Sequence, residues 1–248
     1  MDIAFKIVNS IRGSSLKRRL FHLQLDKGQP ELLLHTDVRW LSRGKFLQRF
    51  RDLLPELRTF LQEQDGQYDI LNDEAWLIDL AFLADFTSIL SNLNLELQGK
   101  NKTIIDMMSS IQAFKTKFIL LIEDLQHKNL HHFTNMTDHL QTHIATNFNT
   151  DKYISKIQKV IEDFDTRFRD FEKIKEIGEF TSFPFKQDLK IKDISEKISN
   201  VFHMDRKELE NEIIILQTDL TLKARKCEED FWKYVNSEKY PNIFKCSQ

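Results

Sequence analysis

The chain has 248 residues, of which 41% are hydrophobic and 30% are charged, and its net charge is −2. This length and apolar content suit a folded core and exclude a disordered tail. Six glycines and four prolines are few, which is typical of a predominantly helical protein.

Several classes of protein are not expected from the sequence. It contains no run of eighteen apolar residues, so we expect no membrane span. The first residues lack the basic and small-residue pattern of a signal peptide, and we expect an intracellular protein. Cys227 and Cys246 are too few for a disulfide framework or a zinc site.

Charge is distributed unevenly along the chain. Residues 1–60 hold twelve Lys and Arg against six acids, whereas the remainder holds 24 basic and 32 acidic residues. A basic end on a mildly acidic body is typical of a one-sided phosphate-binding surface. A solvated helix face rich in Lys and Arg explains the same asymmetry, and both interpretations stay open.

The chain is expected to begin with two short helices. Their apolar spacing covers 3–11 and 15–25, on either side of Gly13. A turn is predicted at 28–30, where glycine and proline occur together.

An extended segment and a basic helix follow the turn. Residues 32–40 are apolar and β-branched enough for a strand, and Ser42 then provides an N-cap hydroxyl. The helix from Ser42 must kink or restart at Pro55, and a loop is expected at 66–72.

The centre of the chain predicts a long antiparallel helical hairpin. Asn72 or Asp73 caps a helix that runs to Gln98, with Gly99 at its C-terminal capping position. One face of this helix carries Trp76, Leu80, Leu83, Leu90, Leu93 and Leu97. The second helix has an unbroken three-four spacing at Ile104, Met107, Ile111, Phe114, Phe118, Leu121 and Leu125. A connection of about three residues makes the two helices antiparallel, each roughly 35–40 Å long.

Two further helices are expected after this hairpin. The third covers 131–148 and buries Phe133, Met136, Leu140, Ile144 and Phe148. The fourth starts after Thr150 or Asp151 and ends at Gly178. Its heptad spacing runs through Ile154, Ile157, Ile161, Phe164, Phe168 and Phe171.

The C-terminal part begins with a predicted aromatic loop at 180–185, where Pro184 excludes helix and three Phe side chains must be buried. A short amphipathic helix then holds Ile191, Ile194, Ile198 and Val201.

Two more helices are expected to complete the chain. Asp205 and Glu208 form a capping box for a helix along Leu209, Ile213, Leu216 and Leu220. A strand at 213–215 is the alternative, but the capping signal favours helix. The last helix, at 223–236, buries Phe231, Trp232 and Val235 and ends before Pro241.

The fold class predicted from these elements is all-α, because no βαβ alternation occurs. We expect an elongated helical bundle built on the long hairpin. The chain 1–248 is treated as a single helical domain with a basic N-terminal segment at 1–40, a main bundle at 41–176 and C-terminal helices at 177–248.

Residues with catalytic or metal-binding chemistry are scarce. The pairs His127 and His131, and His139 and His143, have metal-ligand spacing, but surface helices often carry such histidines. Carboxylates that are adjacent in the sequence, such as Glu162 and Asp163, point in different directions on a helix and cannot clamp a metal by themselves. We therefore predict no catalytic residue, no metal site and no cofactor.

A family resemblance extends over nearly the whole chain. Residues 35–45, followed by a basic amphipathic helix, resemble the TRW-type signature of hAT-superfamily DNA transposases. The chain resembles in particular the domesticated, transposon-derived zinc finger BED domain-containing proteins and the group of general transcription factor II-I repeat domain-containing protein 2. The resemblance continues through 76–85, 93–100, 112–115 and 130–133, and more weakly through 230–232 and 240–241.

The resemblance implies the all-α insertion domain of such transposases, with short flanks of their RNase H-like core. In that family two catalytic acids precede the helix that resembles 1–25, and the third follows the Tyr-Pro that resembles 240–241. This chain is expected to lack those acids, the BED zinc finger and the C-terminal dimerisation segment. The resemblance therefore implies no nuclease or transposase activity.

Trp40 is the functional position that the resemblance carries over, with Arg39 as its motif partner. The Trp of active hAT enzymes stacks near DNA at the transposon end. The alternative is structural: Trp40 fills the seam between 32–40 and the helical hairpin, and Arg39 pairs with Asp37. The candidate DNA contacts are Arg39, Trp40, Arg43, Lys45, Arg49, Lys17, Arg18 and Arg19.

Three functional hypotheses follow. The first is a catalytically inactive, transposase-derived protein-interaction module with protein partners, expected in the nucleus rather than the cytoplasm. The second is weak, non-specific DNA binding through the basic N-terminal segment. The third is a transposon remnant without a selected role. The sequence names neither the partner nor the oligomeric state.

Overall fold

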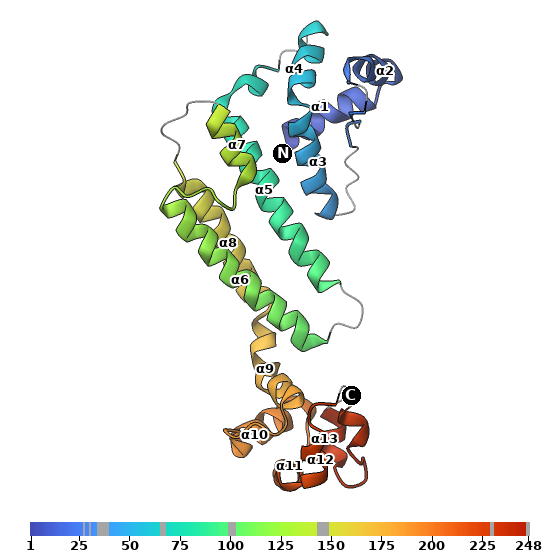
Figure 1. Ribbon diagram of the computed structural model, residues 1–248, viewed down its shortest axis with the longest axis vertical. Coiled ribbons are helices and arrows are strands. Elements are labelled where there is room, and N and C mark those ends of the chain that lie inside the picture. The colour runs from blue at the N-terminus through green and yellow to red at the C-terminus, as the bar shows by residue number, and fades with distance from the viewer. Residues whose placement is uncertain are drawn as a thin grey trace. The chain divides into compact units, whose positions relative to one another are not determined.

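The computed structural model describes residues 1–26, 28–29, 31–33, 40–64, 68–98, 103–142, 149–228 and 231–246, without the side chains at 40–42, 142 and 172–173. Within these residues the regular structure is helical and no strand occurs (Figure 1). The all-α prediction is confirmed.

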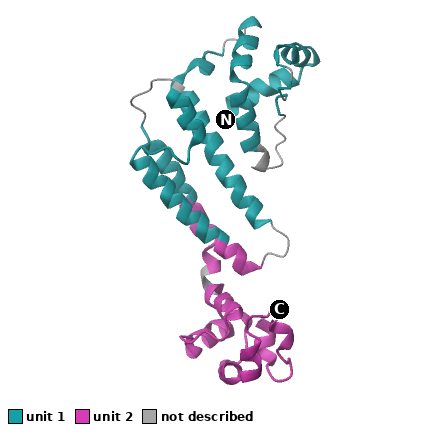
Figure 2. Ribbon diagram, in the orientation of Figure 1, with its two compact units in different colours: residues 1–100, 110–160 teal, residues 101–109, 161–248 magenta. Residues whose placement is uncertain are grey.

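The chain divides into two compact units (Figure 2). Unit 1 contains residues 1–100 and 110–160, and unit 2 contains residues 101–109 and 161–248. The helices α6 (Ile104–Gln126) and α8 (Asp151–Arg167) contribute residues to both units. The single-domain expectation stays a prediction.

Unit 1 begins with two helices where the sequence predicts them, α1 (Asp2–Arg12) and α2 (Ser15–Gln24). The Ser14 hydroxyl caps α2 by accepting the Lys17 backbone N–H at 3.3 Å. The buried face of α1 consists of Ala4, Ile7, Val8 and Ile11.

The signature helix α3 (Trp40–Asp52) begins two residues before Ser42. The predicted N-cap role of Ser42 is therefore wrong, because the backbone is already helical at Trp40. The predicted restart at Pro55 is confirmed, since Pro55 lies in the first turn of α4 (Leu54–Glu63). Proline is tolerated there because the first N–H groups of a helix have no partner within the helix.

The central helix of unit 1 is α5 (Glu74–Leu97), which follows the short 3-10 helix η1 (Asp69–Asn72). The Asp73 carboxylate accepts the Trp76 N–H at 3.1 Å, which confirms the predicted cap. The predicted single apolar face is incomplete, because α3 and α7 (Thr134–Thr142) both pack along α5. The buried residues on α5 outside the predicted face are Leu77, Ile78, Ala81, Phe82, Ala84, Asp85, Phe86, Thr87 and Ile89.

By length and composition alone, α5 could cross a membrane. Its most apolar 18-residue window is 61% buried inside the structure, as in the core helix of a folded protein.

The second helix of the predicted hairpin, α6, buries Ile111, Phe114, Phe118, Leu121 and Leu125 as expected. Ile104 is exposed, so the apolar stripe is covered only from its middle onward. The rings of Phe86 in α5 and Phe118 in α6 lie 5.6 Å apart. The connection at 99–102, with the predicted cap Gly99, lies outside the described residues, and the antiparallel hairpin stays a prediction.

The third predicted helix, α7, begins at Thr134 rather than at 131. Phe133 and Met136 are buried as predicted. Residues 143–148, which include the predicted core positions Ile144 and Phe148, lie outside the described residues.

The fourth predicted helix is two helices, α8 and α9 (Arg169–Ser182), because the backbone at Phe168 leaves the helical region at φ −106° and ψ 15°. The prediction that Gly178 ends this helix is also wrong. A Cβ atom at Gly178 would lie 2.8 Å from the Ile105 side chain. Gly178 therefore permits close packing inside a continuous helix.

The core of unit 2 contains α10 (Ile191–Phe202) and α11 (Arg206–Thr218), which pack against each other. His203 ends α10 in the left-handed conformation with φ 54°. The predicted capping by Asp205 is confirmed, since its carboxylate accepts the Glu208 N–H at 2.9 Å. The alternative strand at 213–215 is excluded because this segment is helical.

The predicted C-terminal helix at 223–236 is wrong, although Phe231 and Val235 are buried as predicted. A new helix, α12 (Leu220–Ala224), starts after Asp219, whose carboxylate accepts the Thr221 and Leu222 N–H groups at 3.1 Å each. Leu220 is consequently exposed rather than buried on α11. The segment predicted as helix 223–236 contains the 3-10 helix η2 (Phe231–Tyr234), and Pro241 begins an additional helix, α13 (Pro241–Cys246).

The predicted aromatic loop is only partly buried. Phe180 lies in α9 and is buried, but Phe183 is 67% exposed. The Pro184 carbonyl accepts a hydrogen bond from the Gln217 side chain of α11. Phe183 faces solvent, contrary to the prediction that all three Phe side chains are buried.

Candidate functional site

The two central residues of the predicted DNA contact, Arg39 and Trp40, have no described side chain. Arg39 lies outside the described residues. Trp40 begins α3, but its side chain is not among those described. Their contact with DNA, and the alternative seam-filling role of Trp40, both stay predictions.

The other predicted contacts on α3 differ in their exposure. Lys45 is exposed, whereas Arg43 and Arg49 are half-buried. The intervening Phe46, Leu47 and Phe50 are buried in the core of unit 1, so the helix has a clear inner face. Lys45 is the α3 residue most available to a phosphate.

The predicted contacts on α2 are partly engaged within the fold. Arg18 forms an ion pair with Glu31 at 2.9 Å, and its hydrogen bond lowers the pKa of that carboxyl. Lys17 donates to the Ser10 hydroxyl at 3.4 Å. Arg19 is exposed and donates to the Ser15 carbonyl in its own helix at 3.3 Å.

A buried carboxylate, Asp85 of α5, organises the interior of unit 1. It accepts the backbone N–H groups of Asn135 and Met136 at 3.1 Å each, and the Asn135 side chain at 2.8 Å. These N–H groups belong to the first turn of α7, where intrahelical partners are missing. Burial raises the pKa of Asp85, and the hydrogen bonds from Asn135 and Met136 oppose this rise.

Two α3 residues complete this polar cluster. Arg51 donates to the Asn135 carbonyl at 3.0 Å, and Gln48 accepts the Asn135 side chain at 2.9 Å. The cluster therefore joins α3, α5 and α7. The only signal in the sequence was that Asp85 lies in the largely apolar run 76–85. Its partner Asn135 lies fifty positions further along the chain.

Unit 2 also contains a buried carboxylate that binds the first turn of a later helix. Glu212 of α11 is buried and accepts the backbone N–H of Ile243 at 2.9 Å and the side chain of Asn242 at 2.7 Å. Asn242 and Ile243 occupy the first turn of α13, as Asn135 and Met136 do in α7. In both units a carboxylate from a core helix thus caps a helix later in the chain.

Two further acids of α5 bind residues of later helices. Glu74 lies 2.9 Å from the Nε2 atom of His139. Asp79 accepts the Tyr153 hydroxyl at 2.7 Å and pairs with Lys152 at 2.6 Å. Burial raises the pKa of Tyr153, and Asp79 adds to the shift.

Of the predicted histidine pairs, His127 contacts the Glu123 carbonyl of its own helix at 2.8 Å. His132 contacts Asp124 at 2.6 Å, and the described residues contain no group of three or more His, Cys, Asp or Glu arranged for a metal. His143 lies outside the described residues.

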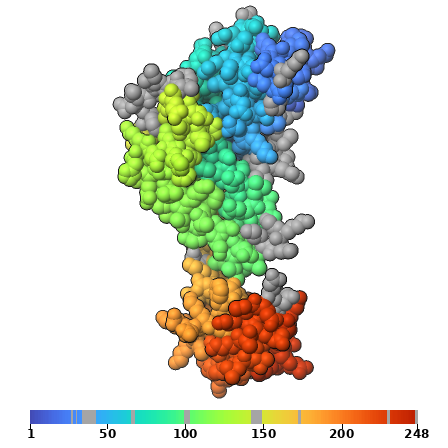
Figure 3. Space-filling model, viewed as in Figure 1, coloured from blue at the N-terminus to red at the C-terminus, as the bar shows by residue number. Residues whose placement is uncertain are grey.

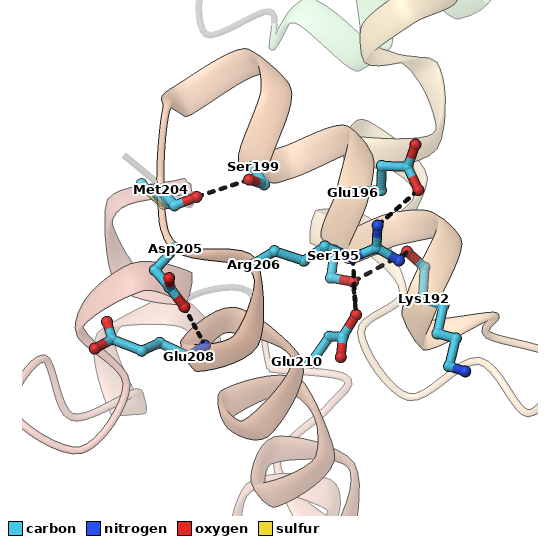
Figure 4. A network of polar contacts seen from close by, with 9 residues as sticks. All are labelled: Lys192, Ser195, Glu196, Ser199, Met204, Asp205, Arg206, Glu208 and Glu210. Carbon is cyan, nitrogen blue, oxygen red and sulfur yellow. Dashed lines mark hydrogen bonds and ion pairs between the residues drawn. The ribbon is translucent and has the colours of Figure 1, made fainter.

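Arg206 links α10 and α11 in unit 2 (Figure 4). It donates to Glu196 and Glu210 at 2.9 Å each. The buried Ser195 donates to the Lys192 carbonyl at 3.0 Å and to Glu210 at 3.2 Å. The hydrogen bond from Arg206 lowers the pKa of Glu210. The bonds from Arg206 to Glu196 and from Ser195 to Glu210 join α10 to α11, which is a structural role.

A surface groove of about 890 Å³ lies between α9, the segment 183–190 and α10. Its rim is occupied by ion pairs of opposite charge. Lys197 pairs with Glu176, and Lys186 lies 3.6 Å from Glu179. The paired charges give the groove no net preference for an anion or a cation.

Among the described side chains of α1 to α4, the large apolar residues that are exposed lie on α2. Leu16, Leu20 and Leu23 all face solvent there, whereas Phe21 is buried against Phe60 of α4 at a ring distance of 5.4 Å. Figure 3 shows the α2 residues at the surface of unit 1. Sequence reasoning treated this helix as basic and did not note its exposed leucines.

Comparison with known proteins places the chain in a family. Residues 1–126 match the family model described as FAM200/GTF2IRD2 helical domain. General transcription factor II-I repeat domain-containing protein 2 of Mus musculus is 31% identical over 247 residues, which is 97% of this chain and 24% of that protein. The Bos taurus protein of the same name is 31% identical over 228 residues, covering 91% of this chain and 22% of that protein.

The chain spans about a quarter of the length of these curated relatives. No solved structure matches it. The predicted resemblance to general transcription factor II-I repeat domain-containing protein 2 is confirmed, whereas hAT ancestry stays a prediction. Because the family model covers half of the sequence, the chain belongs to the FAM200/GTF2IRD2-like helical domain family.

Proposed function

We propose that this chain is a transposase-derived protein-interaction module without catalytic activity, working in a nuclear, transcription-related setting. The family match supports a transposase-derived protein, and the name of the relatives supports the transcriptional setting. We propose a hAT-type transposase as the ancestor.

The observation that carries this proposal is how unit 1 uses its side chains. The buried Asp85 binds the first turn of α7, so its acid chemistry serves the fold. Three large apolar side chains of α2 are instead exposed on one helix. Exposed apolar surface of this kind is typical of protein interaction sites.

The experiment is crosslinking in mammalian cells that express the tagged full chain, followed by imaging and mass spectrometry. We expect nuclear localisation and a reproducible set of crosslinked nuclear proteins that is missing with the tag alone. A chain confined to the cytoplasm, or one that yields the same crosslinks as the tag, contradicts the proposal.

Weak DNA binding is the second candidate, and the exposure of Lys45 and Arg19 favours it. Binding to duplex DNA is measured by fluorescence anisotropy over a range of salt concentrations. Each phosphate contact that is removed should lower the slope of log affinity against log salt by about one. Neutralising Arg43 and Lys45 is therefore expected to reduce the slope.

Lys190→Ala in unit 2 is the matched control, because that lysine side chain is 82% exposed. It should leave the slope unchanged. Undetectable binding at low salt, or a slope that ignores Arg43 and Lys45, excludes this second candidate.

A further inference from the structure

The exposed leucines of α2 form one continuous stripe. Leu16, Leu20 and Leu23 are spaced four and three residues apart, which places them on the same helix face. Their exposed fractions are 63%, 37% and 82%. Phe21 lies on the opposite side and is 3% exposed, so the inner face of α2 is already filled.

The attachment of α2 to unit 1 leaves this stripe outside. The helix packs against α1 and α4 (Figure 1), and the Gln24 side chain donates to Glu63 of α4 at 2.5 Å. The core contacts of α2 therefore need none of the three leucines.

The charge of α2 indicates what could cover the stripe. The helix contains Lys17, Arg18, Arg19 and His22 and no acid. Arg18 is neutralised by Glu31, whereas Arg19 is exposed beside the stripe, three positions after Leu16 and four before Leu23. A partner that buries the leucines next to Arg19 gains from acidic groups at its own edge.

We propose that the leucine stripe of α2 is a docking site for an acidic amphipathic helix of a partner protein. The partner helix would place apolar side chains at helical spacing on Leu16, Leu20 and Leu23, with Asp or Glu facing Arg19 and Lys17. This inference rests on the proposed interaction function and specifies its surface and partner class.

Other occupants fit this surface less well. A second copy of the chain would bring two basic helices face to face, and like charges oppose that pairing. An anionic membrane would suit the basic residues, but Phe21 is buried in the fold and α2 offers only ten residues to a lipid surface. DNA would leave the leucines unburied.

The test uses two synthetic peptides and the purified full chain. One peptide is an amphipathic helix with leucines at helical spacing and flanking glutamates, and the other has lysines in place of the glutamates. Fluorescence anisotropy should detect binding of the acidic peptide and at least tenfold weaker binding of the basic one. Equal affinity for the two peptides, or no binding of the acidic peptide, overturns the proposal.

Substitutions then locate the site. Leu16→Glu and Leu23→Glu should each weaken binding of the acidic peptide by about tenfold or more. Arg19→Glu should weaken the acidic peptide and strengthen the basic one. Leu220→Glu in α12 is the matched control, since Leu220 is 79% exposed, and it should leave the affinity unchanged.

Leu23→Ser is the second variant, should a charge at this position impair folding, and circular dichroism compares the fold of each variant with the parent chain. Peptide affinity that survives both Leu23 variants overturns the proposal. So does tighter binding to phosphatidylserine vesicles than to the acidic peptide, or a dimer in light scattering that Leu23→Glu dissociates. Because these assays use purified components, they can fail while nuclear crosslinking succeeds, and the reverse also holds.

Discussion

At the scale of single residues, the chemistry of this chain is used to hold helices together. Asp85 and Glu212 each accept N–H groups from the first turn of a helix far along the sequence. Buried carboxylates are costly unless they are fully hydrogen-bonded, so these contacts set which helix ends meet. Neither role could be predicted from sequence, because the partner residues are fixed only by the tertiary fold.

Replacement of Asp85 should therefore destabilise unit 1. In Asp85→Ala the N–H groups of Asn135 and Met136 stay buried without an acceptor, and the free energy of unfolding should fall by about 2–4 kcal/mol. Urea unfolding followed by circular dichroism measures this. Glu96→Ala, an exposed acid on the same helix, is the control and should change stability by less than about 0.5 kcal/mol. Equal effects of the two substitutions would contradict the capping role.

Asp219 should make stability depend on acid pH. Hydrogen bonds from Lys239, the Leu222 N–H and Tyr240 hold its pKa at about 2, below the ordinary 3.8. Its contribution to stability is therefore complete above the ordinary pKa and is lost as the pH falls toward 2.

The variant Asp219→Asn checks this dependence in guanidinium unfolding at about pH 7 and about pH 2.5. We expect the variant to be less stable than the parent chain at the higher pH and the difference to shrink at the lower one. A difference that is constant or grows on acidification speaks against a lowered pKa.

At the scale of elements, a helix start could be predicted where its capping side chain is adjacent in the sequence. The caps of α5 and α11 were predictable, because Asp73 and Asp205 lie next to the N–H groups they bind. The continuation of α9 through Gly178 was not, since only the nearby Ile105 explains the glycine. The helix α13 was missed for the same reason, because the carboxylate that caps it belongs to α11.

The contact of α3 with α5 gives a prediction at this scale. A Cβ atom at Gly44 would lie 3.4 Å from the Thr87 backbone, which is ordinary contact distance. Gly44→Ala should therefore be tolerated and gain up to about 1 kcal/mol of helix propensity. Gly44→Val has no room for its additional methyl groups and should lose about 1–3 kcal/mol. Thermal unfolding of both variants checks this, and a stable Gly44→Val would show that α3 does not pack closely on α5.

At the scale of the whole molecule, composition was sufficient for the fold class. Few glycines and prolines and long helical spacings predicted an all-α chain, and the structure confirms it. The division into two compact units was not predicted, because its boundary falls inside the continuous helix α8.

Amide hydrogen exchange can determine how independent the two units are. Glu212→Ala should increase exchange in α11 and α13 of unit 2 and leave α5 protected, because the lost capping bonds lie within unit 2. Asp85→Ala should increase exchange in α5 and α7 of unit 1 and leave α11 protected, because its lost bonds lie within unit 1. Loss of protection in both units from either substitution would instead indicate one cooperative domain.

A remnant without a selected role would lack a specific partner surface, so the proposed interaction function is the central claim. Proximity labelling in living cells tests it most directly, with the full chain, Leu23→Glu, Leu220→Glu and an Arg43→Ala, Lys45→Ala variant compared in parallel. The account predicts nuclear neighbours that are retained with Leu220→Glu and with the neutralised variant and are lost with Leu23→Glu. A set of labelled proteins no different from that of the free labelling enzyme would contradict it.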